Sequence, residues 1–210
     1  AEHYPIMPVQ VVRLDATIMP EEITMANVEE MDRLSPFGCE NPTPIFLLSG
    51  VILQSVSPIG NGNHLRLSVL ADRYTIPMVY FGTSISQFPF TAGDRIDVAC
   101  NLGINEYNDQ RTVSVRVVNV HPSGWRQGEV LRSAATFESI LRGEETADAP
   151  ESFTRNDLIG VFRYLRDNSP ITVGTDGLYY ILRKKLEGYT YFKHLAALQI
   201  MRELELMEET

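Results

Sequence analysis

The chain has 210 residues, 44% of them hydrophobic, and its formal net charge is −9. This length fits one or two domains with a buried core, and because no run of eighteen apolar residues occurs, we expect no membrane-spanning helix and no membrane partner. The negative charge excludes an evenly basic nucleic-acid binder. Residues 45–121, however, carry five arginines and five acidic residues, so the excess acidity lies outside this neutral middle segment.

The pattern of residues 1–36 predicts an N-terminal connector that contains a short helix and forms the end of a preceding domain. Thr24 is placed to cap this helix, and Val28 and Leu34 fall on its apolar face. Pro36 ends the helix, because the residue before a proline avoids helical backbone angles. The first residues lack the basic and apolar stretches of a signal peptide. Two cysteines are too few for a disulfide scaffold, so we expect a reducing, cytoplasmic setting.

In residues 37–122 apolar and polar residues alternate with a period of two, which is typical of β-strands. The five predicted strands read IFLLSGVILQSV, HLRLSVL, YTIPMVYF, RIDVACNL and RTVSVRVVNV. In the second of them, Leu65 and Leu67 are expected to face the core, while His64 and Arg66 face outward. Five short strands in about 75 residues are the usual scale of the OB-fold, a small closed barrel, although the alternation alone also fits a β-sandwich.

Residues 123–152 predict one amphipathic helix followed by a linker. In the segment EVLRSAATFESILRG, four apolar side chains recur at helical spacing, and these are Leu131, Ala134, Phe137 and Leu141. The segment EETADAPES that follows is acidic, rich in small residues and interrupted by proline, which is typical of a linker.

Residues 153–210 predict a second domain, which is helical and winged-helix-like. Thr154 and Asp157 form a capping-box pattern at its first helix, and Thr175 and Thr190 are placed to cap the next two. The last helix, YFKHLAALQIMRELEL, is apolar on most sides and is expected to be largely buried. The predicted fold class is therefore multidomain, with an all-β five-stranded OB-fold barrel followed by a small helical domain.

The stretch LSPFGCENPTPIF resembles the joint that leads into the OB-fold of RecJ-type single-stranded-DNA-specific exonucleases of the DHH phosphoesterase superfamily. The family pattern at this joint is Leu-x-Pro-Phe-Gly-x-Gly-Asn-Pro-x-Pro-x-Phe. The matching positions of this chain are Leu34, Pro36, Phe37, Gly38, Asn41, Pro42, Pro44 and Phe46. Glu40 departs from the pattern, since it stands where the family usually has glycine. We expect a structural role in the joint for Pro36, Phe37, Gly38, Asn41 and Pro42.

The likeness extends beyond this joint. NHLRLSV, YFG, AGDRIDVACNLGINEYN and TVSVRVVNV follow in the order of the family's barrel. FTRNDLIGVFRYLR and YFKHLAALQIMRELELME are similar to the opening and closing helices of an extra C-terminal domain in Gram-positive-type members. The chain thus resembles the C-terminal region of such an exonuclease, the OB-fold together with the C-terminal domain.

The resemblance implies an activity that we do not expect from this chain by itself. Family catalysis depends on clustered aspartates and an Asp-His-His motif, which hold Mn²⁺ or Mg²⁺. The histidines of this chain are far apart in sequence: His3, His64, His121 and His194. We therefore expect no catalytic residue, no metal ligand and no cofactor here, with Mn²⁺ or Mg²⁺ implied only for the catalytic domains of the parent protein.

Two functions remain open at this point. The first is a non-catalytic accessory region that binds single-stranded DNA for a 5′–3′ exonuclease acting in DNA repair and recombination. The alternative is a protein-interaction or architectural module that docks repair partners, such as a single-stranded-DNA-binding protein or a helicase, to the nuclease core.

The candidate DNA-binding residues are outward-facing side chains of the predicted barrel. Arginine pairs with phosphate through two donors and stacks on bases, and exposed tyrosines stack on bases without sequence preference. Tyr107 is expected to be exposed in a hairpin turn, and Tyr74 and Tyr80 are further stacking candidates. The predicted DNA-binding residues are Arg66, His64, Arg116, Tyr107, Arg111 and Arg95.

Overall fold

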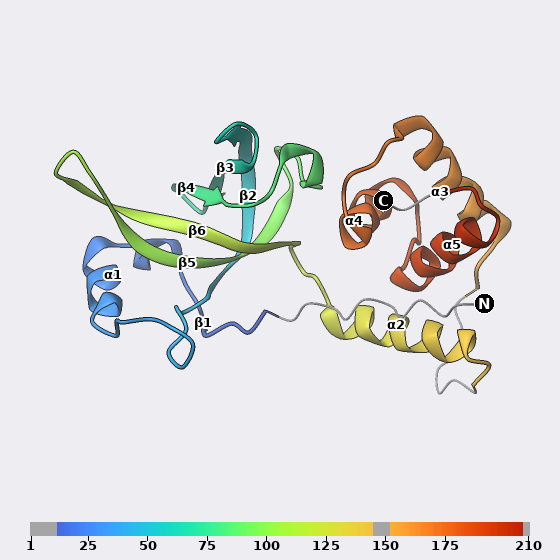
Figure 1. Ribbon diagram of the computed structural model, residues 1–210, viewed down its shortest axis with the longest axis horizontal. Helices are drawn as coiled ribbons and strands as arrows, with labels where there is room; N and C mark the ends of the chain where they lie inside the picture. The colour runs from blue at the N-terminus through green and yellow to red at the C-terminus, as the bar shows by residue number, and fades with distance from the viewer. Residues whose placement is uncertain (1–11, 145–151, 208–210) are drawn as a thin grey trace. The chain divides into compact units, whose positions relative to one another are not determined.

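The computed structural model describes residues 12–144 and 152–207, which form two compact units (Figure 1). Within the described residues, unit 1 comprises 12–85 and 91–124, and unit 2 comprises 86–90 and 125–207. The helices and strands are β1 Ala16–Thr17, η1 Pro20–Glu22, α1 Met25–Asp32, β2 Phe46–Ile59, β3 His64–Ala71, β4 Tyr74–Tyr80, η2 Ile85–Gln87, β5 Arg95–Tyr107, β6 Gln110–Pro122, α2 Gln127–Leu141, α3 Arg155–Asn168, α4 Thr175–Lys185 and α5 Tyr191–Glu203. The division into predicted domains at residues 36, 122 and 152 stays a prediction.

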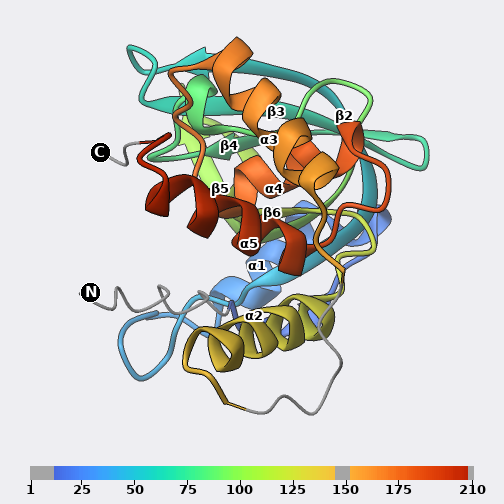
Figure 2. The ribbon, with the colours of Figure 1, turned by 90° about the vertical axis from the view of Figure 1, so that its right-hand side faces the viewer.

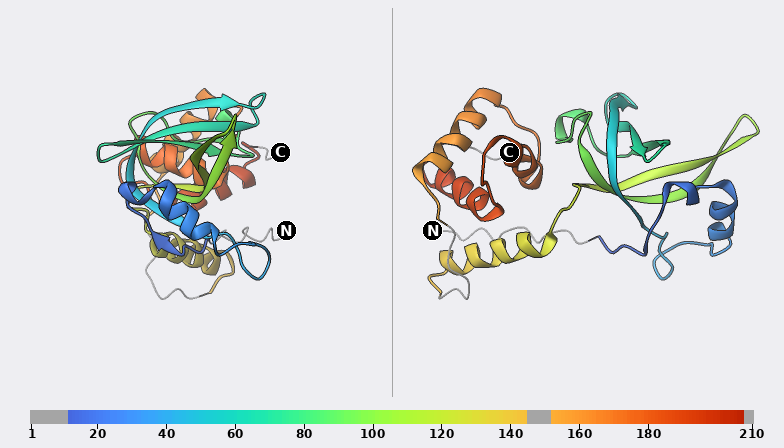
Figure 3. Two further views of the ribbon diagram at one scale, coloured as in Figure 1. Left: turned by 90° about the vertical axis from the view of Figure 1, so that its left-hand side faces the viewer. Right: turned by 180° about the vertical axis from the view of Figure 1, so that it is seen from behind.

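Unit 1 is a closed barrel of five strands. The strands are hydrogen-bonded in the order β2, β3, β4, β6, β5, and a further pairing of β2 with β5 closes the ring. The short β1 adds to β2 in parallel. The predicted five-stranded OB-fold barrel is therefore confirmed, and the β-sandwich is not the fold. The β5–β6 hairpin extends well beyond the other strands (Figure 3, right).

The barrel interior is built from the alternating apolar residues of its strands. Leu65, Leu67 and Val69 of β3 have no exposed surface, and β5 contributes the fully buried Ile96 and Val98. Since successive side chains of a strand point to opposite faces, this burial turns the residues between them outward. The strand that begins with His64 thus presents polar side chains to solvent, as the sequence predicted.

The N-terminal segment packs on the barrel. The Oγ1 of Thr24 accepts a hydrogen bond from the backbone N–H of Asn27, which confirms the predicted cap of α1. Val28 is buried where α1 lies against β5 and β6. Leu34, predicted on the same face, is 62% exposed, because α1 ends before it. In the joint that follows, the side-chain amide of Asn41 donates to the carbonyl oxygens of Leu34 and Pro36 at 2.8 Å and 3.2 Å.

Unit 2 contains α2 to α5, and α5 packs against both α2 and α3 (Figure 2). On α2, Val130 and Phe137 are buried, whereas Leu131 and Leu141 are 43% and 41% exposed, so the prediction that these two leucines are buried with Phe137 is wrong. The ring of Phe137 meets that of Phe192 of α5 edge-on at 5.9 Å between centroids. Leu131 lies about 100° around the helix from the buried Val130, and Leu141 is the last residue of α2.

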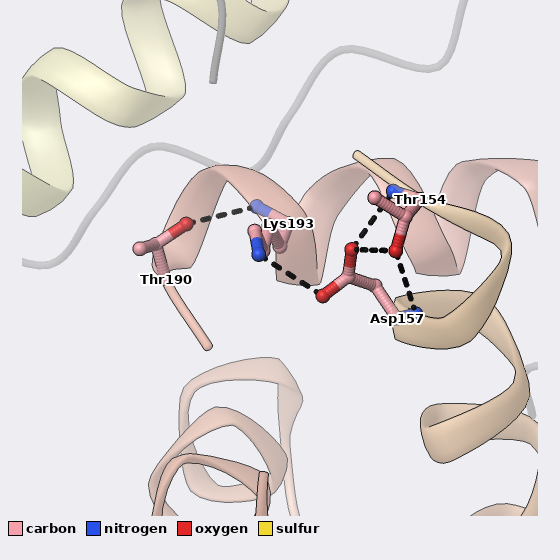
Figure 4. Close-up of polar contacts among 4 residues, drawn as sticks. All are labelled: Thr154, Asp157, Thr190 and Lys193. Carbon is pink, nitrogen blue, oxygen red and sulfur yellow. Dashed lines mark hydrogen bonds and ion pairs between the residues drawn. The ribbon is translucent and has the colours of Figure 1, made fainter. Parts of the chain in front are cut away.

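The helix caps of unit 2 follow the sequence with one exception. Thr154 and Asp157 form the predicted capping box of α3, and the Oγ1 of Thr190 accepts from the N–H of Lys193 at the start of α5 (Figure 4). At α4 the cap is Gly174, so Thr175 is the first residue inside that helix. In the described part of unit 2 all regular elements are helices, and its winged-helix likeness stays a prediction.

The core of unit 2 is rich in aromatic rings and draws on a segment from between two barrel strands. Within residues 86–90, Phe88 and Phe90 are buried, and the Phe90 ring stacks on Tyr180 at 5.6 Å between centroids. The hydroxyl of Thr172 donates to the carbonyl oxygen of Ser86 at 2.7 Å. Trp125 is the only tryptophan of the chain, and it contacts Tyr180 edge-on at 4.9 Å. Its fluorescence therefore reports on the folding of unit 2.

His194 lies in this aromatic core with no exposed surface. Its Nε2 is 3.0 Å from the carbonyl oxygen of Thr175, and its Nδ1 is 3.0 Å from the hydroxyl of Tyr189. A carbonyl oxygen only accepts, so Nε2 carries the proton and Nδ1 accepts from the tyrosine. Burial lowers the pKa of His194 to about 4, which keeps the folded side chain neutral.

Unit 2 is consequently expected to lose stability as the pH falls from about 6.5 toward 4. In this window the unfolded chain binds a proton at His194 that the folded chain excludes, so unfolding takes up a proton. At pH 5 the loss relative to pH 7 amounts to about 2 kcal/mol. Urea titrations followed by Trp125 fluorescence at several pH values measure it. His194→Gln is expected to flatten this part of the pH dependence, and an unchanged slope in that variant would contradict the assignment.

Candidate nucleic-acid interface

Two arginines lie in one row across the outer face of the barrel. Arg66 of β3 is directly opposite Val79 of β4, and Val79 is directly opposite Arg116 of β6. Both arginines are exposed, while Leu65 and Val117 beside them are buried. The row therefore points away from the core. Because neighbouring strands are about 4.8 Å apart, the two arginine Cα atoms are separated by about 10 Å, within reach of one extended polyanion.

The electrostatics of this face favour an anionic ligand. The strands β3, β4 and β6 contain no aspartate or glutamate, although the chain as a whole carries an excess of them. Neither Arg66 nor Arg116 forms an ion pair with any residue that the structure describes. Their guanidinium donors thus stay available for phosphate groups, which arginine binds through paired hydrogen bonds.

His64 and Phe81 lie beside the arginine row. Leu65 and Tyr80 are opposite each other and face inward, so His64 and Phe81, one residue beyond them, are on the outer face. Their rings meet edge-on at 5.1 Å between centroids. The N–H of Gly82 donates to the Nδ1 of His64 at 3.0 Å. The predicted His64 is thus held by backbone and by an aromatic ring, and Phe81 is 55% exposed.

Tyr107 stands at the far end of the same face. It pairs with Gln110 next to the hairpin turn, where Asn108 and Asp109 both have positive φ, as a two-residue hairpin turn requires. Tyr107 is 72% exposed. Since it is six residues from Asn101, the partner of Arg116, it lies on the outer face about 20 Å along β5 from the arginine row. An extended ligand could reach both.

The other two arginine candidates, Arg95 and Arg111, lie outside this row and have partners. Arg95 donates from Nη1 to the carbonyl oxygen of Gly50 at 3.1 Å, at the opposite end of β5 from the hairpin tip. Arg111 forms an ion pair with Glu29 of α1 at 2.6 Å, with the two side chains 47% and 44% exposed. The structure therefore brings His64, Arg66 and Arg116 together on one face and leaves Arg95 and Arg111 outside that group.

The remaining tyrosine candidates are poorly placed for stacking. Tyr80 lies opposite Leu65 and Val117, which are buried, and burial raises the pKa of its phenol. The guanidinium of Arg73 lies over the ring of Tyr74, 5.2 Å from its centroid, and Arg73 also donates to the Tyr74 hydroxyl at 3.1 Å. One face of that ring is therefore already covered.

Phe81 is the residue of this face that the sequence analysis missed. It falls in a segment predicted as strand, and its outward position follows only when the inward–outward alternation of that strand is extended to its last residue. Ile76 and Met78 face inward with Tyr80, so the same period sends Phe81 outward, an exposed ring next to the outward-facing His64.

Two further properties of the described residues bear on function. In residues 12–144 and 152–207, no three histidine, cysteine, aspartate or glutamate side chains are grouped closely enough to hold a metal ion. No helix in these ranges has the length and apolar character needed to cross a membrane.

Comparison with known proteins gives a matching family model and several relatives. Residues 14–119 match the model of the RecJ OB domain. The chain is 31% identical over 136 residues to the single-stranded-DNA-specific exonuclease RecJ of Bacillus subtilis (strain 168), covering 64% of this chain and 17% of that protein.

The solved structures to which the chain is similar include RecJ in complex with Mg²⁺ from Thermus thermophilus, at 24% identity and a TM-score of 0.43, covering 61% of this chain and 21% of that one. The second single-stranded-DNA-binding protein of Mycobacterium smegmatis is similar at 17% identity and a TM-score of 0.32, covering 51% of this chain and 98% of that one. The chain thus spans 17% to 21% of the length of the RecJ proteins that it matches.

Proposed function

The chain belongs to the RecJ OB domain family, and on that premise we propose that its barrel binds single-stranded DNA along the outer face of β3, β4 and β6. The observation that carries the proposal is the row of Arg66 and Arg116 on strands without a carboxylate. In OB-folds the face formed by the second and third barrel strands, here β3 and β4, is the usual oligonucleotide groove.

The similarity to RecJ of Bacillus subtilis supports a proposal for the role of this chain in its parent protein. The similar protein of Bacillus subtilis is by name an exonuclease specific for single-stranded DNA, and this chain spans 17% of it. We propose that the chain is a non-catalytic accessory region, which holds the strand for a 5′–3′ exonuclease used in DNA repair and recombination in the cytoplasm. The metal chemistry, with Mn²⁺ or Mg²⁺, is assigned to catalytic domains of the parent protein.

A binding titration tests the proposal. A fluorescently labelled oligothymidine titrated with the 210-residue chain is expected to bind at low salt. Raising the salt concentration is expected to weaken binding, because each phosphate neutralised by an arginine releases a counterion. In a plot of log affinity against log salt, each such contact contributes a slope of about −0.7 for a single strand. Two arginine contacts therefore predict a slope of about −1.4 or steeper.

Absence of binding at low salt would overturn this function. The protein-docking alternative would then be favoured, and a pull-down with a purified single-stranded-DNA-binding protein or a helicase would test it. A duplex of the same length serves as a control, since stacking on unpaired bases favours the single strand.

A further inference from the structure

The end of the outer face next to Phe81 has the features of a built recognition position. Phe81 directly follows β4 and is 55% exposed, which is uncommon for so large an apolar ring in the part of the chain that the structure describes. It is two residues from Val79, which lies between Arg66 and Arg116, so it is about 7 Å along the strand from the arginine row. An apolar ring thus borders a pair of cations.

The ring of His64 is held from three sides. Its Nδ1 accepts the backbone N–H of Gly82, and its ring contacts that of Phe81 at an interplanar angle of 68°. On a third side lies Gly60, where a Cβ atom would approach the Cδ2 of His64 to 2.9 Å, so only glycine permits the contact. Gly60 also has a φ of +58°, which glycine adopts without strain. These contacts fix the imidazole, and the imidazole in turn restrains the ring of Phe81.

Phe81 is 55% exposed, so part of its ring borders solvent. A Cβ atom built on Gly82, which follows Phe81, or on Gly62, two residues before His64, would have no heavy atom within 4 Å apart from its chain neighbours, so the backbone at these two glycines borders free space. A flat group therefore has room beside the ring. Because an aromatic ring stacks on any nucleobase, and because the adjacent arginines suit the phosphates on either side of that base, a nucleotide unit of a single strand fits both features together.

We infer that Phe81 is a base-stacking position of this interface and that His64 positions its ring. The inference rests on the proposed function and adds the contact that recognises an unpaired base. Phosphate contacts alone do not separate single-stranded DNA from other polyanions, whereas a stacking ring requires a base whose face is accessible. His64 acts through Phe81 in this scheme, with its Nδ1 occupied by Gly82.

Substitutions at Phe81 test the stacking contact. Phe81→Ala is expected to weaken oligothymidine binding about tenfold, without changing the salt slope, because the arginines remain. Phe81→Leu keeps an apolar side chain but removes the ring, and we expect it to bind as weakly as the alanine variant. An oligonucleotide whose bases are replaced by abasic sites is expected to bind the unsubstituted chain and Phe81→Ala equally. Leu131→Ala, at an exposed position of unit 2, is the matched control and should bind normally.

A tryptophan at position 81 tests the role of His64. Phe81→Trp is expected to add a fluorescence signal that oligothymidine quenches, beyond any change seen with Trp125 alone. Adding His64→Ala is expected to reduce this quenching at saturating DNA, since the indole is no longer held against the base. A histidine that merely contributed affinity would leave the quenching at saturation unchanged, and that result would overturn its positioning role.

The outcomes separate this inference from the function on which it rests. If the unsubstituted chain does not bind oligothymidine at any salt concentration, both are overturned. If it binds with the expected salt dependence but Phe81→Ala and Phe81→Leu bind equally well, only the stacking position is overturned.

Discussion

Replacing Arg66 and Arg116 together by alanine is expected to weaken oligothymidine binding about a hundredfold. A charge-assisted hydrogen bond contributes about 1.5 kcal/mol or more, which corresponds to about tenfold for each arginine, and the two side chains share no partner in the described structure. The salt slope is expected to become shallower by about 1.4, since two phosphate contacts are lost. Fluorescence anisotropy at several salt concentrations measures both quantities.

A matched control separates this effect from a change in net charge. Arg33 and Arg126 are exposed and lie outside the barrel strands, each in an ion pair with a nearby glutamate of the chain. The variant Arg33→Ala, Arg126→Ala loses the same charge and is expected to bind within about twofold of the unsubstituted chain, as surface substitutions have small effects. If the two double variants weakened binding equally, the arginine row would not be the site of contact.

Lys193→Met is expected to destabilise unit 2 by about 3 kcal/mol at neutral pH. The Nζ of Lys193 lies 3.0 Å from the Oδ1 of Asp157, and the two side chains are only 17% and 13% exposed. Removing the lysine leaves the carboxylate buried without its counterion, which costs more than the loss of a surface pair. Although burial alone would raise the pKa of Asp157, hydrogen bonds from Thr154 and the ammonium of Lys193 hold it below its ordinary value.

The pH dependence of the stability of unit 2 and the variant Asp157→Asn test the same ion pair further. In the unsubstituted chain the stabilisation from Asp157 is present above its unfolded pKa of 3.8 and is lost as the pH falls through the lower folded pKa. Asp157→Asn is expected to cost less than Lys193→Met, because the asparagine side-chain oxygen can still accept from the backbone N–H of Thr154 and the lysine chain can extend toward water. Urea unfolding followed by Trp125 measures these changes, and Asp157→Asn combined with Lys193→Met gives the coupling energy.

The exposed pair Arg126–Glu129 provides the comparison for the buried one. Its side chains are 77% and 55% exposed, so Arg126→Met is expected to change stability by less than about 0.5 kcal/mol. A Lys193→Met variant as stable as this control would show that the Asp157 carboxylate does not need its partner.

The parts of the fold that the sequence predicted are those set by local pattern. The alternation around Leu65 and Arg66 gave the correct inner and outer faces of β3, because a strand with one buried face leaves its side chains no other arrangement. Thr154 and Asp157 predicted the start of α3, since both partners of a capping box lie within four residues.

The parts that sequence did not predict depend on contacts between distant residues. The ion pair of Arg111 with Glu29 joins residues 82 positions apart, and no local pattern reveals that α1 packs on the β5–β6 hairpin. The buried residues of α2 depend on its packing against α5, which includes the contact of Phe137 with Phe192. The position of the Phe81 ring depends on His64 and Gly60, which lie at the turn between β2 and β3.

The assignment of residues 86–90 to unit 2 means that no single cut in the polypeptide yields two intact pieces. A truncated protein that ends at Gly124 would retain Phe88 and Phe90 but lose Trp125 and Tyr180, which form the aromatic core with them. Two large rings would then meet water, and such a truncation is expected to aggregate. Gene rearrangements that exchange the helical unit between proteins would have to carry this short loop with it.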